Sequence, residues 1–405
     1  TVAAAAQKII DRIDKEYGAV FAKSEVVLNG AKAPNGNRDS ETNNGDLITD
    51  AMVWKILQDK ESLTVDADHV VAVTNGGGIR KAINPGDVTK KNINEVLPFG
   101  NTVVTIYITG AELLEALEAS TYCTPDAIGG FPQVSGINYT ISTAVAYDAN
   151  AETYPASTYY GPKSINRVTI NSINGKEFKA DDTYAVITND FMAAGGDTYY
   201  AFAAATAKFD TGIPLDEVVM EYITAELKGV IGKQYAAPQG RILMNPFADV
   251  KASSWFGKYV IDLYNDGIIN GTSATTYAPN NTLTWAAALK LLLVSNGDLK
   301  AADATGADWS KNAIAKAAEL GLVAADLDGA KAISRLEFCQ VAAKLNKLAE
   351  SKTESKFTDC TDGYVMALVD AKVISGMTET TFEPAASLTR AQIAKILYQL
   401  TLIEK

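Results

Sequence analysis

The spacing of apolar and polar positions divides the chain into two regions. Up to about residue 245, runs with apolar residues at helical spacing alternate with β-branched runs that are typical of strands. Beyond that point, Ala- and Leu-rich helical patterns dominate and strand-like stretches are rare. The pattern therefore predicts an α+β domain with a central mixed sheet over residues 1–245, followed by an all-α domain.

Local signals place several elements of the first region. The run VAAAAQKIIDRIDKEYG has apolar residues at helical spacing and ends on a glycine, so we expect an amphipathic helix over residues 1–18. The pair Asn174-Gly175 lies between two strand-like runs, which predicts a β-hairpin. Two further helices are expected at 41–57 and 110–120, and two strands at 69–75 and 101–109.

The helical region repeats itself. LTW, ISR and LTR mark the same register at Trp285, Arg335 and Arg390, which are 50 (335 − 285) and 55 (390 − 335) residues apart. Each unit is predicted to contain a helix, a Gly-containing turn, a loop and a second helix capped by Thr284, Ser334 or Thr389. A period near 50 is typical of helical units that stack to complete one core. We expect three repeats, at 246–298, 303–349 and 355–405.

Composition narrows the possible functions. The net charge of −12 argues against a partner that presents a phosphate backbone, such as a nucleic acid. No apolar run is long enough to span a membrane, and the N-terminus lacks the pattern of a signal peptide. His69 is the only histidine, and Cys123, Cys339 and Cys360 lack metal-ligand spacing, so we expect neither a metal site nor a disulfide framework in these residues.

Three segments carry candidate chemistry. The first, NGGGIR at 75–80, follows a predicted strand, where glycines let backbone amides approach a ligand and an arginine suits a phosphate. LPFGNTV sets Phe99 on a Pro-Gly turn with Asn101 two residues on, and TNDFMAAGGDTYY adds Phe191 and Asp197. Two loop aromatics can sandwich a base, and an aspartate can accept hydrogen bonds from ribose hydroxyls. Each phenylalanine taken singly could equally be a core residue. The candidate residues are Asn75, Gly76, Gly77, Gly78, Arg80, Phe99, Asn101, Phe191, Gly195, Gly196 and Asp197.

These segments, together with RDSETNNGDLITDAM and GGFPQVSG, occur in the order found in the 5′-nucleotidase family. Residues 1–243 therefore resemble the C-terminal domain of that family. The resemblance implies that Phe99 and Phe191 stack on a base, that Asn101 and Asp197 contact base and ribose, and that arginines hold the phosphates. Those arginines would be Arg38 and Arg80. The chain departs from the pattern twice, with Pro34 where some members have a further arginine and Thr198 where a glycine is usual.

In this family the chemistry belongs to an upstream metallophosphoesterase domain that holds two divalent metals. We therefore expect no catalytic residue and no cofactor in this chain, an N-terminal helix that corresponds to the interdomain linker, and no hydrolysis by the chain alone. The first hypothesis is thus that the chain is the substrate-recognition part of a surface 5′-nucleotidase. Two other hypotheses remain open. The chain could be a structural surface protein that uses a nucleotidase-like fold as a scaffold, or a nucleotide-binding surface protein without turnover.

The helical repeats resemble the S-layer homology family, modules that anchor proteins to bacterial cell walls through a secondary wall polysaccharide. The resemblance implies that Arg335 and Arg390 lie beside grooves for an anionic glycan, because a guanidinium can hold a carboxylate with two hydrogen bonds. Trp285 replaces the arginine of the first repeat. Trp255 and Trp309 could stack on sugars, although core packing is the commoner role for tryptophan in such a pattern. The implied location is the cell surface, and self-association in a lattice remains open.

Overall fold

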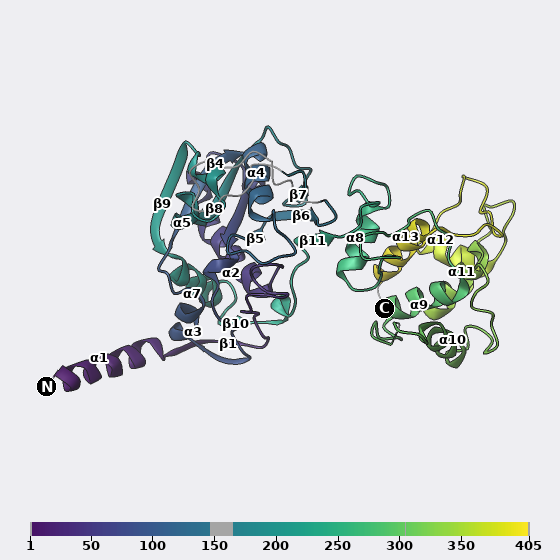
Figure 1. The fold of residues 1–405 in the computed structure, drawn as a ribbon, viewed down its shortest axis with the longest axis horizontal. Helices are drawn as coiled ribbons and strands as arrows, with labels where there is room; N and C mark the ends of the chain where they lie inside the picture. The colour runs from purple at the N-terminus through teal and green to yellow at the C-terminus, as the bar shows by residue number, and fades with distance from the viewer. Residues whose placement is uncertain (1, 146–164, 304, 404–405) are drawn as a thin grey trace. The chain divides into compact units, whose positions relative to one another are not determined.

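The computed structural model describes residues 2–145, 165–303 and 305–403. The chain separates into two compact units, Thr1–Met244 and Asn245–Lys405, called here the first and second units. Figure 1 shows strands and helices in the first unit and short helices in the second. The expected α+β region followed by a helical region is confirmed.

A five-stranded mixed sheet forms the centre of the first unit, as predicted (Figure 1). Strand β2 runs parallel to β8, and the other neighbouring pairs are antiparallel. The strand order is β5 (Pro132–Ser135), β2 (Val70–Asn75), β8 (Thr183–Asn189), β4 (Thr102–Thr109) and β9 (Ala207–Pro214).

The two faces of this sheet pack into separate hydrophobic cores. Alternate residues of β2 point to opposite faces, so that Val70 and Ala72 join one core while Val71 and Val73 join the other. The first core is covered by α2 (Asn43–Leu57), α3 (Lys90–Val96) and α7 (Leu215–Ala225). The second is covered by α4 (Gly110–Ser120) and a small sheet of β11 (Ile242–Asn245), β6 (Ile137–Ser142) and β7 (Val168–Ile173).

The remaining elements lie outside this layered centre. A second small sheet joins β10 (Val230–Ile231), β1 (Val20–Ser24) and β3 (Gly86–Thr89). The other helices are α1 (Val2–Tyr17), α5 (Asp190–Ala193) and α6 (Tyr200–Ala203). None of the described helices is both long and apolar enough to cross a membrane.

Helix starts in the first unit follow their sequence signals. The Thr42 hydroxyl accepts a hydrogen bond from the Gly45 amide at the start of α2, and Thr109 and Glu112 form a reciprocal capping box at the start of α4.

The predicted hairpin at Asn174-Gly175 is wrong in part. Both residues have positive φ and form the expected tight turn, but β7 pairs with β6, and only an isolated bridge from Ile173 to Lys176 follows the turn. The run after the turn is polar and lacks the alternation that a paired strand needs.

The second unit contains three pairs of helices among the described residues. The second helix of each pair begins after Thr284, Ser334 or Thr389, and each of these side chains accepts a hydrogen bond from an amide of its own first turn, as predicted. The helices are α8 (Gly257–Asn265), α9 (Trp285–Asn296), α10 (Trp309–Glu319), α11 (Arg335–Leu345), α12 (Gly363–Asp370) and α13 (Arg390–Thr401).

Backbone hydrogen bonds close the three pairs into a ring. The amide of Trp285 donates to Lys331, that of Arg335 to Ala386, and that of Arg390 to Asn281. Three β-bridges accompany these bonds, Thr284 with Ala332, Ser334 with Ser387, and Thr282 with Thr389. Each pair therefore contacts both others, whereas the sequence indicated only that the units stack.

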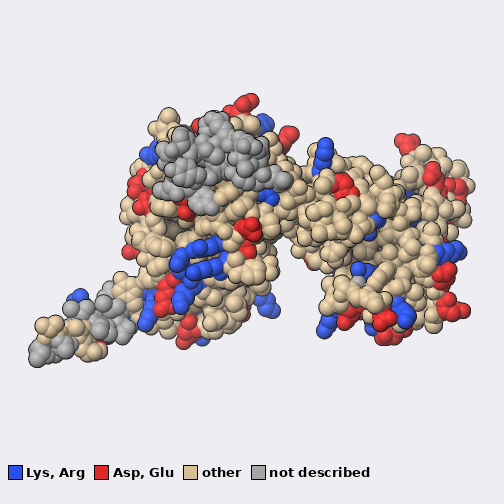
Figure 2. Space-filling view, in the orientation of Figure 1, with Lys and Arg blue, Asp and Glu red and all other residues tan. Residues whose placement is uncertain are grey.

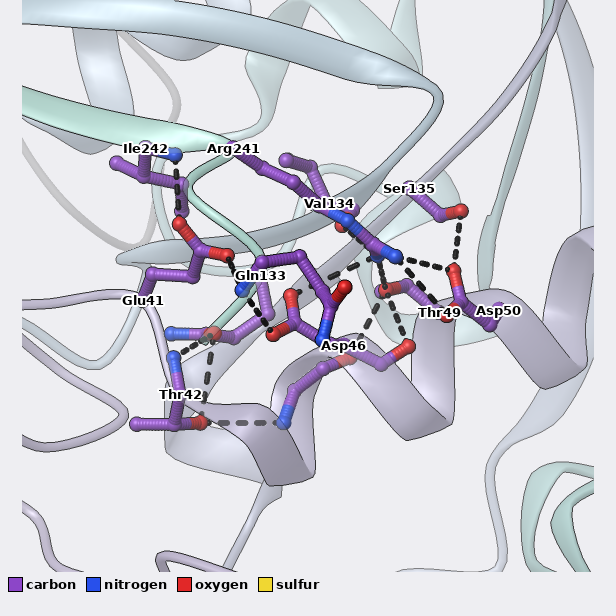
Figure 3. A network of polar contacts seen from close by, with 12 residues as sticks. Glu41, Thr42, Asp46, Thr49, Asp50, Gln133, Val134, Ser135, Arg241 and Ile242 are labelled. Carbon is purple, nitrogen blue, oxygen red and sulfur yellow. Dashed lines mark hydrogen bonds and ion pairs between the residues drawn. The ribbon is translucent and has the colours of Figure 1, made fainter. Parts of the chain in front are cut away.

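An acidic cluster is buried between α2 and the strand that ends the first unit (Figure 3). Glu41 accepts hydrogen bonds from the amides of Gln239 and Ile242, both at 2.8 Å, and Asp46 accepts the Gln239 amide at 3.1 Å. Burial and the neighbouring Glu41 raise the pKa of Asp46 to about 9, so that this carboxyl is protonated at neutral pH. These bonds fix the segment at residues 239–242 against α2.

Arg241 is the cation of the acidic cluster. Its guanidinium lies 2.8 Å from Asp50 and 3.5 Å from Asp46, and it donates to the Val134 carbonyl at 2.8 Å. Asp50 also accepts from the Ser135 hydroxyl at 2.6 Å. Arg241 therefore pairs with the carboxylate of Asp50, on a helix about 190 residues earlier in the chain, which makes the cluster a long-range tie.

Candidate functional site

Three chain segments converge at one edge of the five-stranded sheet. Val103, at the start of β4, pairs with Asn189 at the end of β8, and the parallel register of β2 and β8 brings Asn75 to the same edge. The segments that follow or precede these positions are 76–80, 99–101 and 190–197. The sheet topology therefore gathers all three segments that the sequence singled out.

Both candidate phenylalanines are exposed at this edge. Phe99 is 60% exposed and Phe191 is 44% exposed, so that neither is a core residue. Phe99 lines a pocket together with Gly100, Asn101 and Asn189. We call the two rings the aromatic slot, since each offers a face to solvent where a planar group can stack.

Asn101 and Asp190 connect the two turns that carry these rings. The Asn101 side chain donates to Asp190 Oδ1 at 2.7 Å, and the amide of Phe191 donates to the same oxygen at 2.9 Å. Asn101 lies in the pocket beside Phe99, and its amide nitrogen is held by Asp190. Sequence reasoning missed Asp190, although it stands inside the TNDF run.

Asp197 lies between a donor and a cation. Its carboxylate accepts a hydrogen bond from Asn75 at 2.8 Å. Burial raises the pKa of the Asp197 carboxyl, while the bond from Asn75 and the nearby Arg38 oppose that rise. Arg38 has a buried Nε atom with no hydrogen-bond partner among the described residues, so this cation keeps donor capacity at the site.

The loop that carries Asp197 has two left-handed positions. Gly195 has φ of +91°, and Asp197 has φ of +53°, a conformation that aspartate tolerates better than most residues. Thr198 is buried and is not among the residues with positive φ. The replacement of a glycine by Thr198 therefore imposes no left-handed strain at position 198 itself.

The Phe191 ring packs directly against Gly196. A Cβ atom at Gly196 would lie 2.4–2.6 Å from atoms of the Phe191 ring, and the Gly196 amide donates to the Phe191 carbonyl at 2.9 Å. The ring rests directly on this glycine, which is a packing role in addition to the turn that the sequence indicated.

Gly196→Ala is expected to displace the Phe191 ring and to lower the free energy of unfolding by less than about 1 kcal/mol, because the ring is 44% exposed and can turn into solvent. Thermal unfolding would give the cost, and a crystal structure of the variant would locate the ring. A variant with an unmoved ring and unchanged stability would contradict this packing account.

The glycines of the NGGGIR segment have a different role from the one predicted. The amide of Gly76 donates to the Phe131 carbonyl and that of Gly77 to the Gly129 carbonyl, both at 2.7 Å. A Cβ atom at Gly76 would lie 1.6 Å from the Asn37 carbonyl oxygen. These two amides are therefore committed within the chain, and the glycines allow close backbone packing. Gly78 follows them in the same short turn.

Arg80 stands next to the aromatic slot. Its guanidinium lies 5.7 Å from the centre of the Phe99 ring and donates to the Gly77 carbonyl at 3.1 Å. A cation at this distance over a ring is attracted to its face. Arg80 and Arg38 thus bring two positive charges to an edge that also holds two exposed aromatic rings.

Arg335, in the second unit, lines an open pocket. It is only 6% exposed, donates to the Ser375 carbonyl at 2.7 Å and stacks 4.6 Å from the centre of the Phe382 ring. The pocket is also lined by Trp255, which is 59% exposed, and by Lys395. The core-packing alternative for Trp255 is therefore wrong, and this arginine and tryptophan do share one groove.

Arg390 makes the equivalent contacts at the next position of the ring of repeats. It donates to the carbonyls of Tyr277 and Asn270, both at 2.7 Å, and lies 4.4 Å from the centre of the Tyr277 ring. Trp309 is half-buried, with the ammonium of Lys290 5.4 Å from its ring centre. Both arginines thus hold carbonyls of a neighbouring repeat, a clamping role that the sequence did not indicate.

In two of the three repeats, a lysine lies at the same register position and adds a second positive charge. Lys290 and Lys395 each stand five residues after the register mark of their helix (290 − 285 and 395 − 390), and Gln340 occupies that position in the middle repeat. Trp285, which replaces the arginine in the first repeat, is 8% exposed and packs inward. Sequence reasoning missed the lysines, although the repeat register marks them.

The charge distribution on the surface is mixed. Figure 2 shows acidic and basic side chains interspersed on the visible face of each unit. Among the described residues, no group of three or more His, Cys, Asp or Glu side chains is placed to hold a metal ion. The polar features of the candidate sites are therefore aromatic faces, amides, single carboxylates and cations.

Comparison with known families matches both units. The family described as "5'-nucleotidase, C-terminal domain" matches residues 20–204, and the S-layer homology domain matches residues 246–288 and 359–394. The trifunctional nucleotide phosphoesterase protein YfkN of Bacillus subtilis is 36% identical over 221 residues, which are 54% of this chain and 13% of that protein. Human 5'-nucleotidase is 30% identical over 236 residues, 57% of this chain and 38% of that protein.

One of the similar solved structures is the 5'-nucleotidase precursor from Thermus thermophilus. It is 31% identical, with a TM-score of 0.47, over 60% of this chain and 42% of that chain. The matched part is less than half the length of each of these three proteins.

Proposed function

We propose that the first unit binds nucleosides or nucleotides and that the second attaches to an anionic cell-wall polysaccharide, because residues 20–204 match the C-terminal domain of 5′-nucleotidases and residues 246–288 and 359–394 match the S-layer homology domain. The combination describes the recognition and anchoring part of a nucleotidase-like protein at the outer surface of a cell. Hydrolysis of nucleotides is proposed for the whole protein on the names of its relatives, and the resemblance to their family implies that a separate domain would hold two divalent metals for it.

One observation carries the nucleoside proposal. Phe99 and Phe191 are exposed at the same sheet edge as Asp197, and Asp190 joins their two turns. A base stacked on aromatic rings gains about 1–3 kcal/mol per ring. Asp197 then accepts hydrogen bonds from the ribose, and Asn101 faces the edge of the base.

Phosphates of a nucleotide fit the cations beside the slot. Arg80 lies over Phe99, and Arg38 presents a buried donor next to Asp197. A guanidinium binds phosphate oxygens with paired hydrogen bonds. We therefore expect AMP to bind more tightly than adenosine, with a difference that decreases as salt is added.

A scaffold role is the competing function. Gly76 and Gly77 commit their amides to the chain itself, and Pro34 stands where some family members place a third arginine. Both features reduce the number of groups that could hold a phosphate. A purely structural surface protein would keep the fold and show no saturable binding.

Phe191→Ala and Phe99→Ala are each expected to weaken adenosine binding about 10-fold, because one stacked face is lost. Isothermal titration of adenosine into the full chain measures this change. Phe209→Ala is the matched control, since Phe209 is equally exposed but pairs with Thr105 in the middle of β4, away from the slot. Absence of binding by the wild type at millimolar adenosine would favour the scaffold role.

The wall-attachment proposal uses two of the three equivalent positions in the ring of repeats. Trp255, Arg335 and Lys395 share one groove, and Arg390, Lys290 and Trp309 form the equivalent set at the next position. An anionic sugar can pair with the cations while its ring stacks on the tryptophan. The third position carries Trp285 and Gln340, without a cation at either place.

Lys395→Ala and Lys290→Ala together are expected to lower the affinity for purified secondary cell-wall polysaccharide about 10-fold, because each position loses one cation for the glycan. Unlike the arginines, these lysines are not used to bind carbonyls of a neighbouring repeat among the described residues. Co-sedimentation measures the change, and Gln340→Ala, at the same register in the third position, is the control. The arginines are unsuitable for this test because their loss would also loosen the ring. Equal binding by the double variant and the wild type would contradict the groove assignment.

A further inference from the structure

Two hydrogen bonds connect three residues from separate segments of the site. The Asn189 side chain, at the end of β8, donates to Asn75 Oδ1 at 3.1 Å. Asn75, at the end of β2, donates to Asp197 Oδ2 at 2.8 Å. We call these three residues the amide relay. It leads from the centre of the sheet to the carboxylate that faces the proposed ribose.

The orientation of both amides is determined by their partners. Asn189 Oδ1 accepts the Met192 amide at 2.9 Å, so its nitrogen must face Asn75. Asn75 then uses its oxygen to accept from Asn189, so its nitrogen must face Asp197. Turning either amide over would place two donors or two acceptors against each other. The relay therefore presents a donor to Asp197 and keeps that carboxylate an acceptor.

Both asparagines of the amide relay are buried, where an unmade hydrogen bond is costly. Asn189 is 3% exposed and Asn75 is 7% exposed, and unpaired amides at such sites are costly. Asp197 is held in a left-handed backbone conformation, with φ of +53°. A residue in this conformation persists only when its surroundings fix it. The bond from Asn75 supplies such a restraint.

We propose that Asn75 and Asn189 are positioning residues that hold Asp197 as an acceptor for ribose hydroxyls and so set a preference for ribonucleosides over nucleosides that lack those hydroxyls. The inference rests on the proposed nucleoside-binding function. It also changes the role expected for Asn75, which acts through Asp197 instead of contacting the ligand.

The experiment compares adenosine with 2′,3′-dideoxyadenosine by isothermal titration into the full chain. The wild type is expected to prefer adenosine about 10-fold, the range of hydrogen bonds to a charged acceptor. Asn75→Ala is expected to bring this ratio close to one while dideoxyadenosine affinity changes little, because the aromatic slot is intact. Asp197→Ala should give the same ratio, and the double variant should lower it no further.

Asn75→Asp is the second test of the same relay, since it keeps the shape of the side chain and replaces the donor with an acceptor. The preference for adenosine should be lost at pH 8 and return in part near pH 5, where one of the two facing carboxyls is protonated. Asn171→Ala, which removes an exposed asparagine of β7 that bonds Asn138, serves as the control and should retain the wild-type ratio. Circular dichroism verifies that each variant is folded.

Two outcomes overturn different claims. If the wild type prefers adenosine and both Asn75 variants keep that preference, the relay does not position Asp197 and the inference is wrong. If the wild type binds neither nucleoside, the proposed function itself fails, and the inference fails with it.

Discussion

Arg241→Met is expected to lower the free energy of unfolding of the first unit by about 3–5 kcal/mol, because it leaves the Asp50 carboxylate of the acidic cluster without its cation. Arg241 lies 2.8 Å from Asp50 and 3.5 Å from Asp46, and its side chain is largely buried. Methionine keeps much of the apolar stem, so lost charge pairing accounts for most of the change.

Scanning calorimetry of the full chain measures this effect, since the two compact units can give separate transitions. The transition of the first unit should move down by about 10 °C. Lys55→Met is the matched control, because Lys55 pairs with the exposed Glu221 and its loss should cost less than about 1 kcal/mol. Equal shifts for both variants would show that the acidic cluster is no stronger than a surface ion pair.

Asp46→Asn is expected to stabilise the first unit at pH 8 and to leave it almost unchanged near pH 4. In the folded chain the pKa of Asp46 is raised from 3.8 to about 9, first by burial and then by Glu41. Between those values the folded state keeps a proton that the unfolded state has lost. The contribution of Asp46 to stability is therefore most favourable below pH 4 and falls as the pH rises toward 9, by up to about 1.4 kcal/mol per pH unit.

Asparagine is neutral at every pH and nearly the same shape, so it removes this dependence. The measurement is urea unfolding of wild type and variant at pH 4, 6 and 8, with the unfolding of the first unit followed by Trp54 fluorescence in a background where Trp255, Trp285 and Trp309 are replaced by phenylalanine. The stability difference should grow in favour of the variant as the pH rises. A constant difference across the three pH values would mean that Asp46 is ionised in the folded protein.

Local signals predicted elements well where the signal and the structure concern the same few residues. Thr284, Ser334 and Thr389 cap the helices that their sequence positions predict. The hairpin at Asn174 failed because the turn signal is local, whereas the choice of β6 as partner depends on a strand about 30 residues away.

Long-range features of the fold could not be predicted from the sequence. Asp46 and Asp50 stand one helical turn apart, a spacing common on exposed helices, and nothing nearby indicates that Arg241 will cover them. The ring of repeats depends in the same way on bonds such as that from Arg335 to Ser375, between different repeats.

The candidate site was predicted in its residues more than in their roles. Phe99, Phe191 and Asp197 were singled out because two loop aromatics and an acid beside glycines can hold a nucleoside, but the sequence left open whether each ring is exposed, which the structure decides. The roles of Gly76 and Gly77 were wrong because glycine allows close approach of a ligand and of the chain itself equally, and only the Phe131 and Gly129 carbonyls decide between them. Lys290 and Lys395 were missed because lysines are common on helices, and only the contacts between repeats place them near Arg390 and Arg335.

The account depends most on the aromatic slot, and a crystal structure of the chain grown with AMP tests it most directly. We predict an adenine ring stacked between Phe99 and Phe191, a ribose hydroxyl on Asp197, and a phosphate near Arg38 and Arg80. A structure at saturating AMP in which the slot is empty, or in which the nucleotide lies elsewhere, would contradict the proposal.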